Sequence, residues 1–220
     1  MSVNAPLSRA SANAELSFLH RFEAGRDPAA TPLLLLHGTG GDENDLIQLG
    51  RMIAPDAPLV SPRGKVMEGG MPRFFRRLRE GVFDEADVRL RAGELAAFVA
   101  EARAAYGLAA PIAVGFSNGA NIAAATLLTQ PGVLAGAVLL RAMVPLAEPP
   151  AEDLASAPVL LLSGGMDPIV PEENAARLAG QLTEAGARLD HRTLPVGHGL
   201  SQADLTLARD WLAALGKPRA

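Results

Sequence analysis

Gly115-Phe116-Ser117-Asn118-Gly119 fits the G-x-S-x-G pattern, in which a serine stands at a sharp turn between a strand and a helix. Residues 111–114 before it form a short apolar run typical of a buried strand, and residues 120–130 after it are typical of a helix. Such a turn forces the serine into a strained backbone conformation that exposes its hydroxyl. The pentapeptide alone would also fit an ordinary turn, but its flanking segments favour a nucleophile elbow with Ser117 as the nucleophile.

Outside this stretch, apolar runs and helical spacing alternate along the chain. Short apolar runs predict strands, and apolar residues near a 3.6-residue period predict helices between them. The expected strands are residues 15–22 (an edge strand), 33–36, 58–61, 111–114, 134–140, 158–162 and 188–194, and the expected helices are residues 44–53, 87–106, 118–130, 172–185 and 202–215. This alternation predicts an α/β fold with a mostly parallel central sheet and helices on both faces.

The segments between these elements indicate the domain organisation. The longest irregular segment is residues 62–84, and residues 141–157 are too few for a separate cap domain. The sequence shows no internal repeat and no linker that would divide it. We expect residues 1–14 to form a flexible lead-in and residues 15–220 to form a single domain.

Composition narrows the class of protein. The 220 residues carry a net charge of −4, so the chain lacks the excess of basic residues that is typical of proteins binding nucleic acid or an anionic membrane. The absence of cysteine excludes disulfides, a thiolate nucleophile and thiolate metal sites. No apolar run is long enough to span a bilayer, and residues 1–13 lack the apolar region of a signal peptide, so we expect a cytoplasmic location. A homodimer is compatible with this composition.

A serine nucleophile needs a base, and the base needs a carboxylate to orient it. Of the two histidines downstream of Ser117, His191 lies inside an expected strand, whereas His198 lies in the glycine-flanked loop after that strand. Asp167 follows the expected strand at residues 158–162, and sites in open α/β sheets form at such strand ends. We therefore predict His198 as the base and Asp167 as the acid, although an Asx turn would also explain this aspartate.

A glycine-rich loop is the candidate for the oxyanion hole. His37-Gly38-Thr39-Gly40-Gly41-Asp42 follows the strand at residues 33–36 and can aim a backbone N–H at the developing oxyanion. We assign this donor to Thr39, with Gly40 as the runner-up, and the second donor to the backbone N–H of Asn118. A dinucleotide-binding fingerprint does not fit, because a glutamate stands where its last glycine belongs. The acidic residues after the loop suit a helix start without a metal, so we expect no metal and no organic cofactor.

The irregular segment at residues 62–84 contains candidates for substrate binding. Met71, Phe74 and Phe75 are candidates for the wall of a pocket, and Arg73 for contact with a substrate carboxylate. Hydrophobic anchoring of a long loop would explain the same apolar residues at least as well.

Together these motifs resemble the phospholipase/carboxylesterase family of α/β-hydrolases, which includes bacterial carboxylesterases and acyl-protein thioesterases. The resemblance spans residues 33–215 and rests on the loop at 37–42, the elbow at 115–119, Asp167-Pro168-Ile169-Val170-Pro171 and Gly197-His198. It implies an α/β-hydrolase fold without a separate cap domain and a Ser117–His198–Asp167 triad with backbone donors at Thr39 and Asn118. Family members often have Gln and Gly where this chain has Asn118 and Ala120; the first change leaves the backbone donor in place.

The expected activity is hydrolysis of carboxylic or thio esters through an acyl-enzyme, by a carboxylesterase that acts on small soluble esters. Acyl transfer, peptide hydrolysis and perhydrolysis remain alternatives, because the same triad supports them. A non-catalytic binding scaffold is the remaining alternative.

Overall fold

A central sheet of seven strands organises the computed structural model, which describes residues 15–150 and 152–215. The lead-in predicted for residues 1–14 lies outside the described residues. In spatial order the strands are β1 (His20–Glu23), β3 (Leu59–Pro62), β2 (Leu33–Leu36), β8 (Ile112–Phe116), β9 (Gly136–Leu140), β10 (Pro158–Gly164) and β11 (Arg188–Leu194). Only β1 runs antiparallel to its neighbour, β3, and the other pairs are parallel. The predicted mostly parallel sheet is confirmed.

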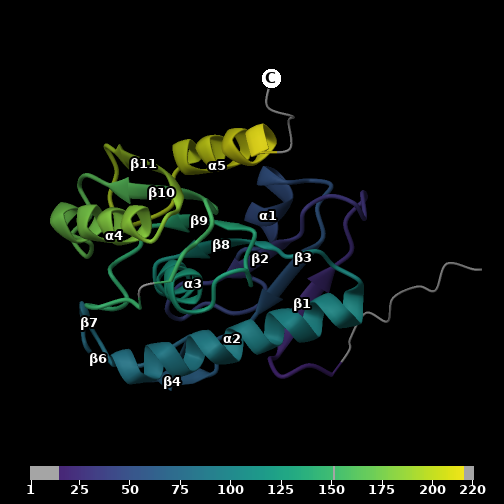
Figure 1. The fold of residues 1–220 in the computed structure, drawn as a ribbon, viewed down its shortest axis with the longest axis horizontal. Helices are drawn as coiled ribbons and strands as arrows, with labels where there is room; N and C mark the ends of the chain where they lie inside the picture. Colours follow the sequence, from purple (N-terminus) through teal and green to yellow (C-terminus); the bar gives the residue numbers. More distant parts are fainter. Residues whose placement is uncertain (1–14, 151, 216–220) are drawn as a thin grey trace, which may run out of the picture.

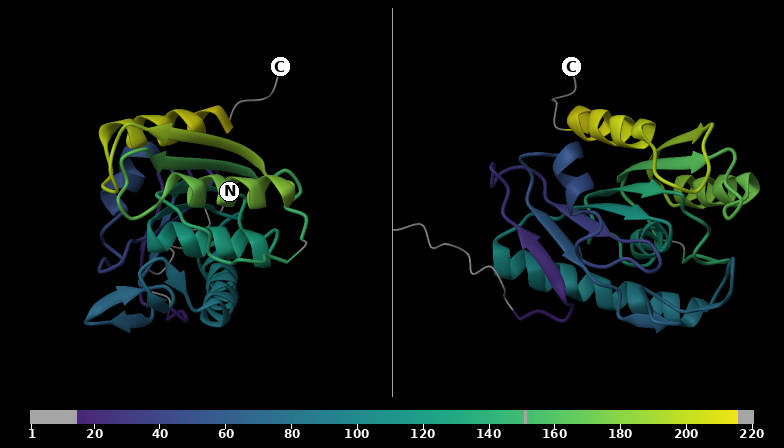
Figure 2. Two further views of the ribbon diagram at one scale, coloured as in Figure 1. Left: turned by 90° about the vertical axis from the view of Figure 1, so that its left-hand side faces the viewer. Right: turned by 180° about the vertical axis from the view of Figure 1, so that it is seen from behind.

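Helices cover both faces of the sheet (Figures 1 and 2). Along the chain they are α1 (Ile47–Ile53), α2 (Glu85–Tyr106), α3 (Asn118–Thr129), α4 (Glu172–Glu184) and α5 (Gln202–Leu215). Side chains of α1 and α5 belong to one apolar cluster, and side chains of α2, α3 and α4 belong to the other. Strand β2 shows why both layers form: Leu33 and Leu35 enter the first cluster, while Leu34 and Leu36 enter the second. A strand of four leucines can be buried on both faces only between two helical layers.

Two hairpins replace the irregular segment that we expected at residues 62–84. Strands β4 (Val66–Glu68) and β5 (Met71–Arg73) pair in antiparallel fashion, as do β6 (Arg77–Arg79) and β7 (Val82–Phe83). Gly69 and Gly70 form the first turn with φ values of 57° and 85°, which suit a two-residue hairpin turn that requires positive φ. The Gly-Gly pair is therefore the hairpin signal that the sequence prediction missed.

Other element boundaries differ by a few residues. Helix α1 begins at Ile47 rather than residue 44, because the Asp42 carboxylate accepts the Asn44 N–H in a local turn. Helix α2 begins at Glu85 rather than residue 87, where the Asp84 side chain caps it by accepting the Asp87 N–H. Over the described ranges, no helix combines the length and apolarity that a membrane crossing would need.

Candidate active site

Ser117 occupies the sharp turn between β8 and α3 in an unusual backbone conformation, with φ 52° and ψ −114°. Its N–H donates to the Leu140 carbonyl (2.9 Å), and its carbonyl accepts the Asn121 N–H (2.9 Å). A Cβ added at Gly119 would collide with the backbone of Leu36 and His37, so the helix can approach the strand only with glycine there. The packing thus holds Ser117 at positive φ, a conformation that costs of order 1–3 kcal/mol and persists only when the surroundings impose it.

The structure brings His198 and Asp167 to Ser117. The Asp167 Oδ2 atom accepts a hydrogen bond from His198 Nδ1 (2.8 Å), which leaves Nε2 to accept from the Ser117 hydroxyl (3.0 Å). The imidazole lies beside the Phe116 ring, with centroids 5.3 Å apart and ring planes tilted by 45°. By contrast, His191 lies in β11 with its Nε2 atom 3.0 Å from Ser163 Oγ. The hydroxyl, imidazole and carboxylate therefore form one continuous chain of hydrogen bonds.

Asp167 uses its two carboxylate oxygens differently. Its Oδ1 atom accepts the N–H groups of Ile169 (2.8 Å) and Val170 (3.0 Å), and Oδ2 contacts the imidazole. The side chain is completely buried. The Asx turn that we considered as an alternative is thus present, and it orients the same carboxylate toward His198.

Main-chain hydrogen bonds join the loops that carry His198 and Asp167. Gly165 N–H donates to the Leu194 carbonyl (2.7 Å), and Met166 N–H donates to the Val196 carbonyl (3.0 Å). A Cβ at Gly164 would lie 2.6 Å from the Val196 carbonyl oxygen, so this close approach needs glycine. The two loops consequently form one packed unit at the ends of β10 and β11.

The loop after β2 distinguishes the two candidate oxyanion donors. Gly40 N–H already donates to the Pro72 carbonyl (3.0 Å). Within the described part of the chain, the N–H groups of Thr39 and Asn118 donate to no protein acceptor, and both residues line the cavity at Ser117. The Thr39 hydroxyl accepts from Arg73 Nη1 (2.5 Å), which ties the loop to β5. This arrangement favours Thr39 over Gly40.

A cavity of about 250 Å³ opens at Ser117. Its walls come from the loop after β2, both hairpins, the elbow with the start of α3, and the loops after β9, β10 and β11: Thr39, Arg73, Arg77, Glu80, Gly81, Phe83, Phe116, Ser117, Asn118, Asn121, Met143, Ile169 and His198. The sequence analysis missed Asn121, Met143, Ile169 and the residues of the second hairpin. Their lining role depends on how distant segments pack, and no local pattern carries that information.

Of the four predicted substrate-binding residues, the structure places only Arg73 on this cavity. Phe74 and Phe75 are buried in the apolar core, where Phe74 packs beside His37 and Phe75 meets the edge of Phe83. Met71 is 42% exposed and lies outside the cavity lining. For the two phenylalanines, hydrophobic anchoring is therefore the role that their packing shows.

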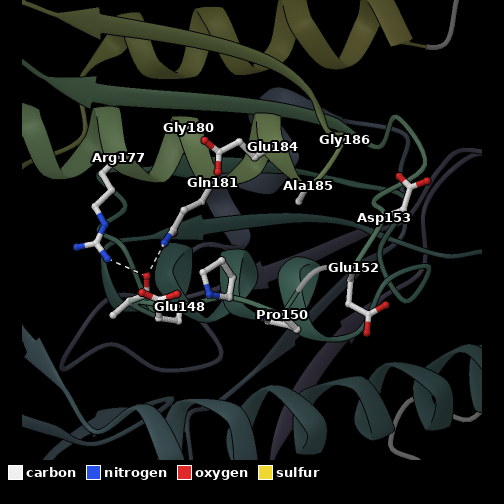
Figure 3. A pocket seen from close by; sticks show the side chains of 12 residues that line it. Glu148, Pro150, Glu152, Asp153, Arg177, Gly180, Gln181, Glu184, Ala185 and Gly186 are labelled. Atoms are coloured by element: carbon white, nitrogen blue, oxygen red, sulfur yellow. Dashed lines mark hydrogen bonds between the residues drawn. The ribbon is translucent and has the colours of Figure 1, made fainter.

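A larger hollow of about 820 Å³ lies between α4 and residues 147–150 and 152–153 (Figure 3). It shares no lining residue with the cavity at Ser117. Its acidic side chains are spread around the opening in Figure 3 and do not converge on one point. Across residues 15–150 and 152–215, no cluster of three or more His, Cys, Asp or Glu side chains is arranged to hold a metal ion.

His37 holds the loop at residues 37–42 in place through hydrogen bonds from both ring nitrogens. Its Nδ1–H donates to the Gly38 carbonyl (2.7 Å), and its Nε2 accepts the Gly64 N–H (2.9 Å). Protonation would place a second hydrogen between Nε2 and a group that can only donate. Burial is the main cause that lowers the pKa of His37 below its ordinary value of 6.5.

The buried His37 predicts acid sensitivity. As pH falls below about 6.5, the unfolded chain binds a proton that the folded chain does not, so the free energy of unfolding decreases by up to about 1.4 kcal/mol per pH unit. Burial lowers the pKa of His191 as well, which adds to the slope. Urea denaturation at several pH values between 7 and 5 gives the free energy of unfolding as a function of pH. This free energy should fall less steeply with decreasing pH for His37→Gln than for the wild type, whatever the absolute stability of the two proteins. An unchanged slope would contradict this assignment.

The sequence profile of the Phospholipase/Carboxylesterase family matches residues 19–215, which is most of the chain. The chain belongs to this family. The family predicted from the motifs is therefore confirmed, together with the α/β-hydrolase fold.

Individual proteins also resemble the chain over most of its length. It is 45% identical over 194 residues to the protein named "Putative hydrolase MhqD" of Bacillus subtilis (strain 168), covering 87% of this chain and 96% of that protein. The crystal structure of the Bacillus cereus carboxylesterase matches with a TM-score of 0.88 and 40% identity, over 91% of this chain and 95% of that one. The structure of YahD with malic acid matches with a TM-score of 0.84 and 31% identity, over 90% and 98%.

Proposed function

We propose that the protein is a serine carboxylesterase that cleaves small soluble esters, carboxylic or thio, through an acyl-enzyme. The observation that carries this proposal is the chain of hydrogen bonds from Ser117 to His198 (3.0 Å) and from His198 to Asp167 (2.8 Å). Family membership supports ester hydrolysis as the reaction class. Ser117 Oγ attacks the ester carbonyl carbon while His198 Nε2 takes the hydroxyl proton.

The remaining steps follow from the same groups. The N–H groups of Thr39 and Asn118 donate to the tetrahedral oxyanion. The bond to the leaving group breaks, and the imidazolium of His198 gives its proton to the leaving oxygen or sulfur. Water then attacks the acyl-enzyme, His198 takes a proton from that water, and the proton returns to Ser117 Oγ as the acid leaves. Asp167 holds Nδ1–H throughout, so Nε2 always faces the serine.

A panel of esters and a covalent probe test this proposal together. A fluorophosphonate should label the purified protein stoichiometrically at Ser117, and p-nitrophenyl esters should be turned over fastest at short acyl chains, because the cavity is only about 250 Å³. A maximum at long acyl chains would contradict the small-ester preference. Absence of both labelling and hydrolysis would favour a non-catalytic scaffold. Product analysis with a competing alcohol, amine or peroxide separates hydrolysis from acyl transfer, peptide cleavage and perhydrolysis.

The charges of the cavity further suggest an ester that carries a carboxylate. Arg73 and Arg77 both line the cavity and share one carboxylate, that of Glu68, at 3.1 Å and 2.8 Å. Burial first, and the charge of Arg77 second, lower the pKa of Arg73, as expected where positive charge is only partly compensated. Glu80 lines the same cavity, and its negative charge would repel a substrate carboxylate. A structure of the relative YahD contains malic acid, a dicarboxylic acid.

Two single substitutions should change the preference for a carboxylate-bearing ester in opposite directions. Arg77→Gln should lower the ratio of kcat/KM for a dicarboxylic acid monoester to that for a neutral ester about tenfold, and Glu80→Gln should raise it, because a charge-assisted hydrogen bond contributes about 1.5–3 kcal/mol. The neutral ester is the internal control for damage to the triad. Equal changes for both esters would show that these side chains do not sense substrate charge.

A further inference from the structure

Arg141 is a buried cation that the proposed reaction does not use. It follows β9 directly, with a positive φ of 57°, and its side chain has no exposed surface. Its N–H donates to the Leu162 carbonyl (2.9 Å) at the end of β10. A fully buried arginine needs partners for its charge and for its hydrogen-bond donors.

The guanidinium finds an acceptor for each of its five N–H donors. Nη1 and Nη2 donate to the two carboxylate oxygens of Asp204, both at 2.8 Å, and Nη1 also donates to the Leu162 carbonyl (3.1 Å). Nε donates to the Gly197 carbonyl (3.0 Å), and Nη2 donates to the Gly199 carbonyl (3.3 Å). These last two carbonyls belong to the residues on either side of His198.

Asp204 anchors this arginine at the beginning of α5. Its carboxylate also accepts the N–H (2.8 Å) and the hydroxyl (2.7 Å) of Ser201. Burial works against the negative charge, but the hydrogen bonds from Arg141 and Ser201 outweigh it and hold the pKa of Asp204 below its usual value. The loop that carries His198 is thus connected to both β9 and α5 through one guanidinium.

We propose that Arg141 is a positioning residue, which sets the place of the His198 imidazole by holding the carbonyls before and after it. This inference rests on the proposed function. The planar guanidinium suits the task, because its donors diverge in a fixed fork and reach two carbonyls and a carboxylate at once. A lysine would place one compact charge beside Asp204 and would lack that fork. A shift of about 1 Å in a catalytic group can lower a rate about 10²-fold.

The experiment replaces the Arg141 guanidinium without leaving an unpaired charge in the protein interior. Arg141→Met alone would leave the buried Asp204 carboxylate without a partner for its charge, so the main variant is Arg141→Met/Asp204→Leu. Arg141→Lys, which keeps a positive charge beside Asp204, is the second. Arg177→Met is the matched control, because Arg177 also donates to a loop carbonyl, that of Ala147 (2.8 Å), on a segment that does not carry the triad. Near-ultraviolet circular dichroism and thermal unfolding establish that each variant is folded.

The expected result separates positioning from a structural role. Both Arg141 variants should lose about 10²-fold in kcat and in the rate of fluorophosphonate labelling of Ser117, with KM changed less than about threefold. Arg177→Met should behave as the wild type. A folded double variant with wild-type kcat would overturn the proposal, and so would full activity in Arg141→Lys, since charge alone would then suffice. An inactive, unlabelled wild type would instead contradict the proposed function.

Discussion

Ser117→Ala is expected to lower kcat by about three to six orders of magnitude while the protein remains folded. The substitution removes the only atom that can form the acyl-enzyme in the proposed mechanism. It leaves Nε2 of His198 without its hydroxyl partner, but the imidazole is still held by Asp167 (2.8 Å). Steady-state hydrolysis of a short p-nitrophenyl ester measures the loss, and thermal unfolding measures the fold.

The chain offers a matched control for this experiment. Ser163 Oγ lies 3.0 Å from His191 Nε2, the same distance as between Ser117 and His198, but Ser163 stands in β10 rather than on an elbow. Ser163→Ala should therefore leave turnover and fluorophosphonate labelling at wild-type levels. Labelling that persists in Ser117→Ala and disappears in Ser163→Ala would show that the nucleophile has been misassigned.

Asp167→Asn is expected to lower kcat/KM about 10⁴-fold with little change in the fold. The N–H groups of Ile169 and Val170 hold the Oδ1 position, so the amide oxygen should remain there. The amide NH₂ group would then face Nδ1 of His198 and donate to it. The imidazole would be forced into the tautomer with hydrogen on Nε2, which cannot accept the serine proton.

Asp190→Asn is the control for this substitution. Asp190 lies in β11 and forms an ion pair with Arg192 (2.8 Å), in which both side chains are partly exposed. This variant should keep its fold, because surface ion pairs contribute only about 0–1 kcal/mol to stability. It should also keep wild-type kinetics, because Asp190 does not line the cavity at Ser117. More than a tenth of wild-type activity in Asp167→Asn would mean that another carboxylate orients the base.

The sequence predicted the sheet and the residues that meet at its edge, because both depend on regular rules. Continuous apolar runs such as Leu33–Leu36 indicate strands buried on both faces, and parallel strands bring their carboxyl ends to one edge. Residues just after those strands, Ser117, Asp167 and His198, could therefore be grouped although 81 residues separate the first from the last.

The parts that could not be predicted depend on single long-range contacts. The motif assigns the donor to Thr39, but the contact that favours Thr39 over Gly40 is the hydrogen bond from Gly40 N–H to the Pro72 carbonyl, in a hairpin whose packing no periodicity reveals. The burial of Phe74 and Phe75 depends on the same hairpins. Arg141 did leave a local signal, since a charged residue directly after an apolar strand calls for a partner, but nothing local identifies Asp204, 63 residues later.

The bond between Arg141 and Asp204 also has a consequence for the order in which the chain becomes competent during synthesis. Strand β9 and the elbow emerge from the ribosome well before α5, and domains generally form as units. The guanidinium can complete its set of acceptors only after Asp204 has docked. A nascent chain that lacks α5 would leave the Arg141 guanidinium without its carboxylate partner, so we expect the loop around His198 to become ordered only once α5 has docked.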